Sequence, residues 1–192
     1  MAQEPTPSTP RIAGLEAILK GQAGQGAAPV ERWNPPYCGD IGIEILRDGT
    51  WLYQKSPIGR KPLVQLFARV LRKDDDGRTY LVTPAEKVDV RVADAPFLAV
   101  EMEVQGEGEG QTLIFRTNVD DIVTCDAEHP LRFEIEAGSG GLKPYLRVRG
   151  RLEALVTRAL YQDLVALAVD HPTVADRIGV WSGAAFFSLD AA

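Results

Sequence analysis

The fold class follows from the stretch IGIEILRDGTWLY, residues 41–53. Its three isoleucines alternate with other residues, which is the period of a β-strand. Asp48-Gly49 lies between two such runs and is a strong signal for a hairpin turn. Closure by a two-residue turn would place the isoleucines with Leu52 on a core face, and Trp51 and Tyr53 on a half-covered face. We therefore predict an antiparallel hairpin here.

A helix and two further strands are predicted to follow this hairpin. Residues 62–72 carry apolar side chains at helical spacing, and Pro62 suits the first position of a helix. Residues 80–83 have the composition of a strand that Pro84 ends, and residues 88–92 alternate as another strand. The N-terminal half thus combines a hairpin with a separate helix.

The C-terminal half shows a similar pattern. Residues 97–104 and 111–115 form a predicted hairpin around a glycine- and glutamate-rich tip, and residues 131–136 pair with 145–156 in another. Residues 157–169 have the spacing of a long helix. The apolar segment near the C-terminus is expected to pack back as a strand or a sealing segment.

The order of hairpin and helix therefore occurs twice, in residues 41–54 with 62–72 and in residues 131–152 with 157–169. We predict an α+β fold of two small domains with a duplicated hairpin-and-helix core. A short amphipathic helix is expected over residues 12–19. The predicted organisation is a tail, short helix and linker over 1–29, an N-terminal hairpin-helix domain over 30–90, and a C-terminal antiparallel β domain with a long helix over 91–192.

Composition excludes several classes of protein. The 192 residues are 45% hydrophobic and 25% charged, which is typical of a soluble globular protein. A net charge of -6 disfavours bulk nucleic-acid binding, and no apolar run has the roughly 18–20 residues of a membrane span. Two cysteines and no export signal predict a cytoplasmic protein. With only two histidines and no ligand cluster, neither a metal nor a cofactor is expected.

An arginine-rich strand is the first candidate binding feature. Residues 145–151 alternate, so Tyr145 and the three arginines are predicted to share one face, where guanidinium groups can grip phosphate or carboxylate. Symmetric pairing with the preceding strand would set Glu134 opposite Arg147 but Arg132 opposite Arg149, a like-charge contact. The row therefore remains open to two interpretations, an anion site or cross-strand pairing.

The second candidate is Gly59-Arg60-Lys61, just before the predicted helix. Cations are unfavourable at a helix N-terminus, and a bound anion would restore the balance. In the alternative interpretation, both side chains bend into solvent, where the penalty is small.

The sequence also resembles a known bacterial family, domain of unknown function 1285 (DUF1285), from about residue 30 to residue 165. The resemblance rests on the ordered segments WNPPYCGDIGIEILRDGTWLYQKSPIGRKPLVQLFARVL, YLVTPAEK, DAPFLAV, FRTN, HPL and PYLRVR. One departure is Lys55, where the family tends to have glycine. The resemblance implies a duplicated, β-roll-like core and a C-terminal domain loosely similar to pleckstrin-homology folds. It also implies a site for a nucleotide-like ligand between the domains and a role in signal transduction.

The leading hypothesis is a non-catalytic cytoplasmic ligand-binding or sensory protein for a small anionic, nucleotide-like ligand. In it, aromatic rings stack on the ligand, arginines bind its phosphate, and polar side chains recognise its edges. Arg158, on the last helix, is expected to lie outside the site. The candidate ligand-binding residues are Trp51, Tyr53, Arg60, Glu86, Lys87, Asn118, Tyr145, Arg147 and Arg149.

Two alternatives belong to other functional classes. The first is an enzyme acting on a phosphorylated small molecule, with Glu86 or Asp94 as the base and Lys87 nearby. The second is a protein-interaction module whose half-exposed aromatic side chains bind a partner. No feature of the sequence fixes an oligomeric state.

Overall fold

The computed structural model describes residues 27–190, so the predicted helix over 12–19 lies outside the described residues. The described chain divides into two compact units. The N-terminal unit contains residues 27–44 and 51–91, and the C-terminal unit contains residues 45–50 and 92–190. Both units are mostly β-sheet, and each contains one α-helix, so the fold is α+β in two domains. Neither helix has the length and hydropathy of a membrane crossing.

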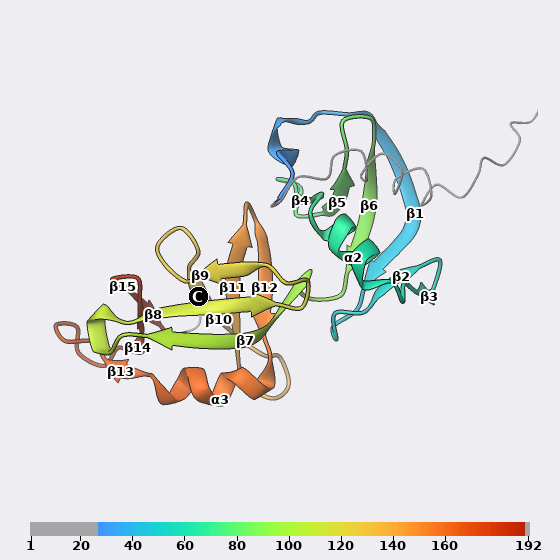
Figure 1. Ribbon diagram of the computed structural model, residues 1–192. Helices are drawn as coiled ribbons and strands as arrows, with labels where there is room; N and C mark the ends of the chain where they lie inside the picture. The colour runs from blue at the N-terminus through green and yellow to red at the C-terminus, as the bar shows by residue number, and fades with distance from the viewer. Residues whose placement is uncertain (1–26, 191–192) are drawn as a thin grey trace, which may run out of the picture. The chain divides into compact units, whose positions relative to one another are not determined.

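One six-stranded sheet and one helix make up most of the N-terminal unit (Figure 1). The sheet order is β3-β2-β1-β6-β5-β4. Backbone hydrogen bonds from Lys87 to Pro36 and from Ala93 to Ile45 advance in the same direction along β1 and β6, so these two central strands are parallel. The elements are η1 (Val30–Arg32), β1 (Tyr37–Ile45), β2 (Trp51–Tyr53), β3 (Ser56–Pro57), α2 (Lys61–Ala68), β4 (Leu71–Lys73), β5 (Thr79–Val82) and β6 (Lys87–Val92).

The predicted hairpin of β1 and β2 forms, but its register differs from the prediction. The N–H of Leu46 donates to the carbonyl of Thr50 at 2.9 Å, so the turn holds three residues instead of two. Gly49 adopts a φ of 80°, the left-handed conformation that closes such a turn. A one-residue shift exchanges the faces of a strand. Trp51 is consequently only 2% exposed and packs in the core, with its ring 6.3 Å from that of Phe67.

The helix α2 is shorter than predicted. It ends at Ala68, whereas the apolar spacing predicted a helix to residue 72. Val70 and Leu71 are buried as predicted, but Leu71 begins β4 and pairs with Leu81 of β5. The last apolar residues of the predicted helix therefore lie outside α2, and Leu71 pairs in a strand instead. Their side chains reach the core equally well from an extended backbone.

A second six-stranded sheet forms the centre of the C-terminal unit, with the order β10-β11-β12-β7-β8-β9. The predicted hairpin of β7 and β8 is confirmed, with Gln105 opposite Thr112. In contrast to the predicted antiparallel domain, β12 and β7 are parallel. The elements are β7 (Phe97–Gln105), η2 (Gly108–Gly110), β8 (Thr112–Thr117), β9 (Ile122–Thr124), β10 (Leu131–Ile135), β11 (Leu142–Arg149), β12 (Leu152–Val156), α3 (Arg158–Ala166), β13 (Val169–Asp170), β14 (Ile178–Ser182) and β15 (Ala185–Ser188).

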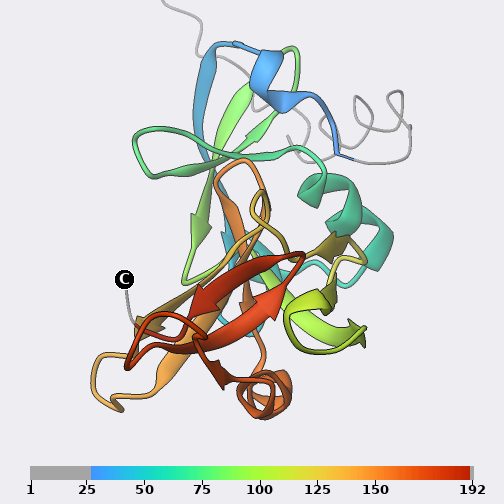
Figure 2. The same cartoon turned by 90° about the vertical axis from the view of Figure 1, so that its left-hand side faces the viewer.

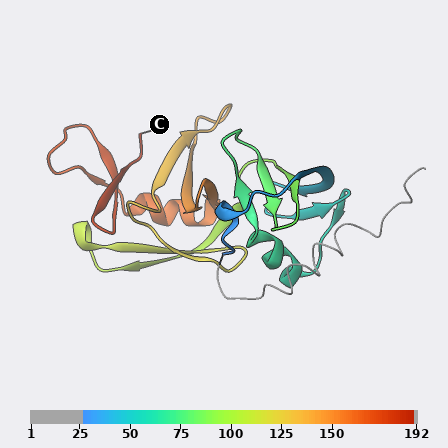
Figure 3. The same cartoon turned by 90° about the horizontal axis from the view of Figure 1, so that it is seen from above.

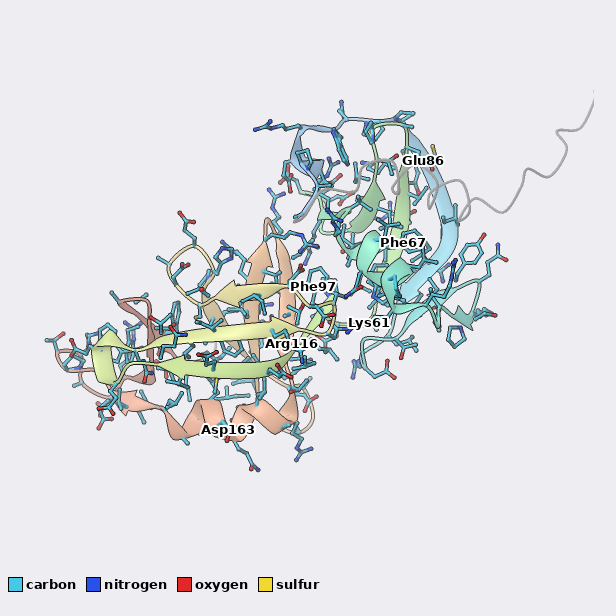
Figure 4. All side chains as sticks on the ribbon, viewed as in Figure 1. Lys61, Phe67, Glu86, Phe97, Arg116 and Asp163 are labelled. Carbon is cyan, nitrogen blue, oxygen red and sulfur yellow. The ribbon has the colours of Figure 1, made fainter. Side chains whose placement is uncertain are left out.

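The helix α3 lies alongside β7 (Figure 3). Its Leu164 is buried, while Asp163 points away from the sheet (Figure 4). The apolar C-terminal segment forms the hairpin of β14 and β15, which packs against β8 and β10 (Figure 2). The helix α3 (Arg158–Ala166) is also shorter than the helix that was predicted over residues 157–169.

The pairing of β10 with β11 corrects the predicted arginine row. Arg132 lies opposite Tyr145 and Glu134 opposite Lys143, so the expected contact of Arg132 with Arg149 does not form. The chain also turns at residues 150–151, and a bulge separates the two strand arginines, so residues 145–151 are not one regular strand. Only a short hairpin joins β11 to β12, where a single long strand was predicted.

Candidate functional site

A groove in the C-terminal unit has the size of a small-molecule site. Its volume is about 470 Å³, within the range of roughly 300–1,000 Å³ that is usual for ligand pockets. Three parts of the unit line it: the turn between β10 and β11, the adjoining ends of β11 and β12, and the first turn of α3. All of these parts can be followed in Figure 1. We call this feature the α3 groove.

The floor of the α3 groove is apolar. Leu142 and Pro144 come from the start of β11, and Leu155 and Val156 from the end of β12. These strands are antiparallel, with Tyr145 opposite Leu155, so the start of one lies beside the end of the other. Pro144 and Val156 are buried, whereas Leu142 and Leu155 remain half-buried. The floor can therefore take up apolar surface from a ligand.

Lys143 also lines the groove, but its charge is already matched. Its ammonium group pairs with the carboxylate of Asp94, which also accepts a hydrogen bond of 2.7 Å from the Tyr145 hydroxyl. Burial alone would raise the pKa of Asp94, but the hydrogen bonds from Lys143 and Tyr145 outweigh it and lower that pKa. Burial would likewise lower the pKa of Lys143, yet its contacts with Asp94 and Tyr145 raise it. Both groups therefore stay charged at neutral pH.

The first turn of α3 contributes a cation and a phenol. Arg158 and Tyr161 are three residues apart, which places them on the same side of the helix. Arg158 is exposed, and within residues 27–190 it makes no ion pair. Tyr161 is half-buried. Together they add hydrogen-bond donors to the lining of the groove.

The turn between β10 and β11 contributes an acceptor on another part of the rim. The carboxylate of Glu136 accepts a hydrogen bond of 2.6 Å from the Ser139 hydroxyl, which in turn accepts one from the N–H of Gly141. The N–H of Glu136 also bonds to the carbonyl of Gly141 and closes the turn. The groove thus combines apolar lining residues with one carboxylate and one guanidinium that has no ion-pair partner among residues 27–190, which is an arrangement for binding an amphipathic small molecule.

Among the predicted site residues, Trp51 is the clearest correction. It was expected on a half-covered face, but the shifted register buries it against Phe67, so its ring is not available to stack on a ligand. Tyr53, two residues later, is half-buried. Arg60 immediately precedes α2 and is exposed. All of these residues belong to the N-terminal unit and none lines the α3 groove.

Glu86 and Lys87 lie at the start of β6, where Figure 4 labels Glu86. The ammonium of Lys87 pairs with Asp74 at 3.1 Å and lies 4.4 Å from the centre of the Tyr80 ring. Burial, together with a hydrogen bond to Asp76, raises the pKa of Tyr80 to about 12. Lys87 is therefore part of a polar network of the N-terminal unit. The alternative base Asp94 instead contacts Lys143 and Tyr145 in the C-terminal unit.

Asn118 connects parts of the C-terminal unit. Its side-chain oxygen accepts a hydrogen bond of 3.0 Å from the N–H of Leu98 at the start of β7. Its side-chain nitrogen approaches Gly49 so closely that a Cβ atom there would lie 2.7 Å away. Gly49 is therefore required by this contact as well as by its positive φ. The amide that was expected to recognise a ligand already has a partner in the protein.

The remaining predicted residues lie on or near β11 but do not form one row. Tyr145 is 4% exposed, and its ring lies 4.4 Å from the guanidinium of Arg132. Arg147 is exposed and lies opposite Glu153. Arg149 pairs with Asp121 at 2.6 Å. Of these residues, Tyr145 is tied to the α3 groove through its shared partner, Asp94.

Sequence reasoning missed the charged residues of the groove. Arg158 was expected to lie outside the predicted ligand site, and the structure places it in the lining of the α3 groove. Glu136, Lys143 and Tyr161 were not singled out. The spacing of Arg158 and Tyr161 on a predicted helix was the available signal, because residues three apart share a side.

Comparison with known proteins identifies the family. The N-terminal domain model of the domain of unknown function DUF1285 matches residues 28–95, and the C-terminal domain model of the same family matches residues 96–189. Among curated proteins, none matches the chain.

Two solved structures are similar to this chain. A DUF1285 family protein from Silicibacter pomeroyi DSS-3 is 43% identical, with a TM-score of 0.84 over 92% of this chain and 94% of that one. A second, from Shewanella baltica OS155, is 26% identical, with a TM-score of 0.52 over 66% of this chain and 91% of that one. Since both halves match in order and a 43% identical relative is covered almost throughout, the chain belongs to the DUF1285 family.

Proposed function

We propose that this DUF1285 protein is a non-catalytic binding protein with a sensory role, and that its α3 groove takes up a small organic anion. The observation that carries the proposal is the guanidinium of Arg158, which lines the groove beside apolar residues and has no ion-pair partner among the described residues. A guanidinium binds carboxylate or phosphate through paired hydrogen bonds, and the floor contributes contact area for the rest of the molecule. Lys143 also lines the groove, but its ion pair with Asp94 already matches its charge.

Isothermal titration calorimetry on the full chain tests this proposal, with hexanoate, benzoate and hexyl phosphate as probes. At least one of these anions should bind, and Arg158→Gln should weaken that binding about fivefold, as expected for an exposed charge-assisted contact. Arg177→Gln is the matched control, because Arg177 is an exposed arginine of the same unit outside the groove. Its affinity should equal that of the wild type.

A second variant separates the α3 groove from the arginine site predicted from sequence. Arg147→Gln should leave the affinity unchanged, because Arg147 does not line the groove. If Arg147→Gln weakens binding and Arg158→Gln does not, the groove is not the site. If none of the probes binds, the proposed function is wrong.

A further inference from the structure

The charges around the α3 groove restrict the kind of anion that fits it. Of its two cations, Lys143 is paired with Asp94, whereas Arg158 has no carboxylate partner within the described residues. One unmatched positive charge complements one negative charge on a ligand. A polyphosphate would carry several negative charges into a site that compensates only one of them.

The net charge of the C-terminal unit also favours a ligand with one negative charge over a ligand with several. Residues 45–50 and 92–190 contain nine Lys and Arg against seventeen Asp and Glu, a net charge of −8. A field of this sign lowers the local concentration of polyanions more steeply than that of monoanions. A single carboxylate is therefore favoured over a nucleotide polyphosphate.

Glu136 supplies the complementary feature. Its carboxylate accepts a hydrogen bond from Ser139, and within residues 27–190 no Lys or Arg forms an ion pair with it. An anionic group of a ligand would be repelled by this charge and a neutral donor could only form a hydrogen bond to it, whereas an ammonium group would gain both a hydrogen bond and ionic attraction. Arg158 and Glu136 come from different elements, with the apolar floor as the third part of the lining.

Resting on the proposed function, we propose that the α3 groove binds an amphipathic zwitterion. Its carboxylate bonds to Arg158, its aliphatic or aromatic body covers the floor of Leu142, Pro144 and Leu155, and its ammonium group faces Glu136. The ligand class is thus the amino carboxylates with an extended apolar body.

A matched series of small molecules tests this inference by calorimetry on the full chain. The probes are ω-amino carboxylates with chains of about four to eight carbons, the alkanoates of the same lengths, and the corresponding alkyl phosphates. The best amino carboxylate should bind roughly three- to fivefold more tightly than the alkanoate of equal length, the gain of one exposed ion pair. Varying the length locates the ammonium relative to Glu136.

Two variants test whether Glu136 and Arg158 cause the difference in affinity between amino carboxylates and alkanoates. Glu136→Gln should remove the preference for the amino carboxylate, because the amino carboxylate loses an attractive charge and the alkanoate loses a repulsive one, whereas Arg158→Gln should weaken both classes. Glu128→Gln, an exposed carboxylate of the same unit outside the groove, is the control and should preserve the preference. Circular dichroism of each variant verifies the fold.

The outcomes separate the inference from the proposed function. Arg158-dependent binding of alkanoates without a preference for the amino carboxylates would overturn the inference and leave the proposed function standing. Tighter binding of the alkyl phosphates would do the same. Binding that is insensitive to Arg158→Gln, or no binding by any probe, would overturn both.

Discussion

In the N-terminal sheet β1 and β6 are neighbours at the centre, and in the C-terminal sheet β7 and β12 hold the same positions. Counted outward from these pairs, both sheets have one strand order: β3-β2-β1-β6-β5-β4 and β9-β8-β7-β12-β11-β10. The helices break the equivalence, since α2 connects the third strand to the fourth and α3 follows the sixth. Strand order alone therefore does not create the groove, because the groove needs a helix that begins where β12 ends.

The two units also use their charged residues differently. The described N-terminal unit contains ten Lys and Arg against eight Asp and Glu, a net charge of +2, in contrast to the −8 of the C-terminal unit. In the N-terminal unit the arginine Arg72 is 9% exposed and is enclosed by backbone carbonyls and Asp74. In the C-terminal unit Arg132 forms its ion pairs on a partly exposed face. Similar topology thus supports a buried network in one unit and a surface network in the other.

The largest effect is expected from the core of the N-terminal unit. Trp51→Ala should lower the free energy of unfolding by about 4 kcal/mol, because a fully packed aromatic side chain is lost. Urea denaturation followed by circular dichroism measures this. Tyr53→Ala, on the same strand but half-buried, should cost much less. Equal, small losses for both variants would contradict the three-residue turn and restore the register predicted from the sequence.

The second largest effect is the expected difference in unfolding free energy between variants of the buried network at Arg72 and the surface network at Arg132. Arg72→Leu should cost about 3 kcal/mol, because Asp74 and the carbonyls of Val30 and Trp33 lose their shared partner. Arg132→Leu should cost less than about 1 kcal/mol, because its ion pairs with Glu153 and Glu134 are partly solvated. Chemical denaturation of both variants measures the comparison. Equal costs would remove the distinction between the two networks.

A smaller effect on the free energy of unfolding is expected at alkaline pH, through Tyr80 of the N-terminal unit. The pKa of Tyr80 is raised to about 12 in the folded protein, against an ordinary value of about 10. The unfolded chain therefore loses this proton first, so the stabilisation is complete below about pH 10 and is lost as the pH rises toward about 12. Tyr80→Phe should flatten the fall in unfolding free energy over this window. An unchanged slope in the variant would assign the alkaline loss to other groups.

Sequence patterns predicted elements better than they predicted connections. The alternating isoleucines and the turn dipeptide predicted the hairpin of β1 and β2, but its register depends on whether Arg47 joins Asp48 and Gly49 in the turn as a third residue. The contact of Gly49 with Asn118, which the sequence does not show, adds a tertiary requirement for glycine in this turn. A change of one residue then moved Trp51 from a candidate site into the core.

The groove was missed for related reasons. Pro144 lies within β11, an interior strand of its sheet, where proline is rare because it has no N–H to donate. The predicted strand therefore began at Tyr145, and Lys143 was left in a loop. Arg158 was expected to lie outside the site, because nothing in the sequence places the start of α3 beside the turn after β10.

Ligand binding in the α3 groove is tested by mapping the chemical shift changes in ¹H–¹⁵N NMR spectra as hexanoate is added to the full chain. We expect the largest changes on residues 136–143 and 155–161, the segments that line the α3 groove, and we expect Arg158→Gln to need about fivefold more hexanoate for the same changes. Changes centred instead on Arg60 and Tyr53 in the N-terminal unit, or on Arg147, would contradict binding in the α3 groove.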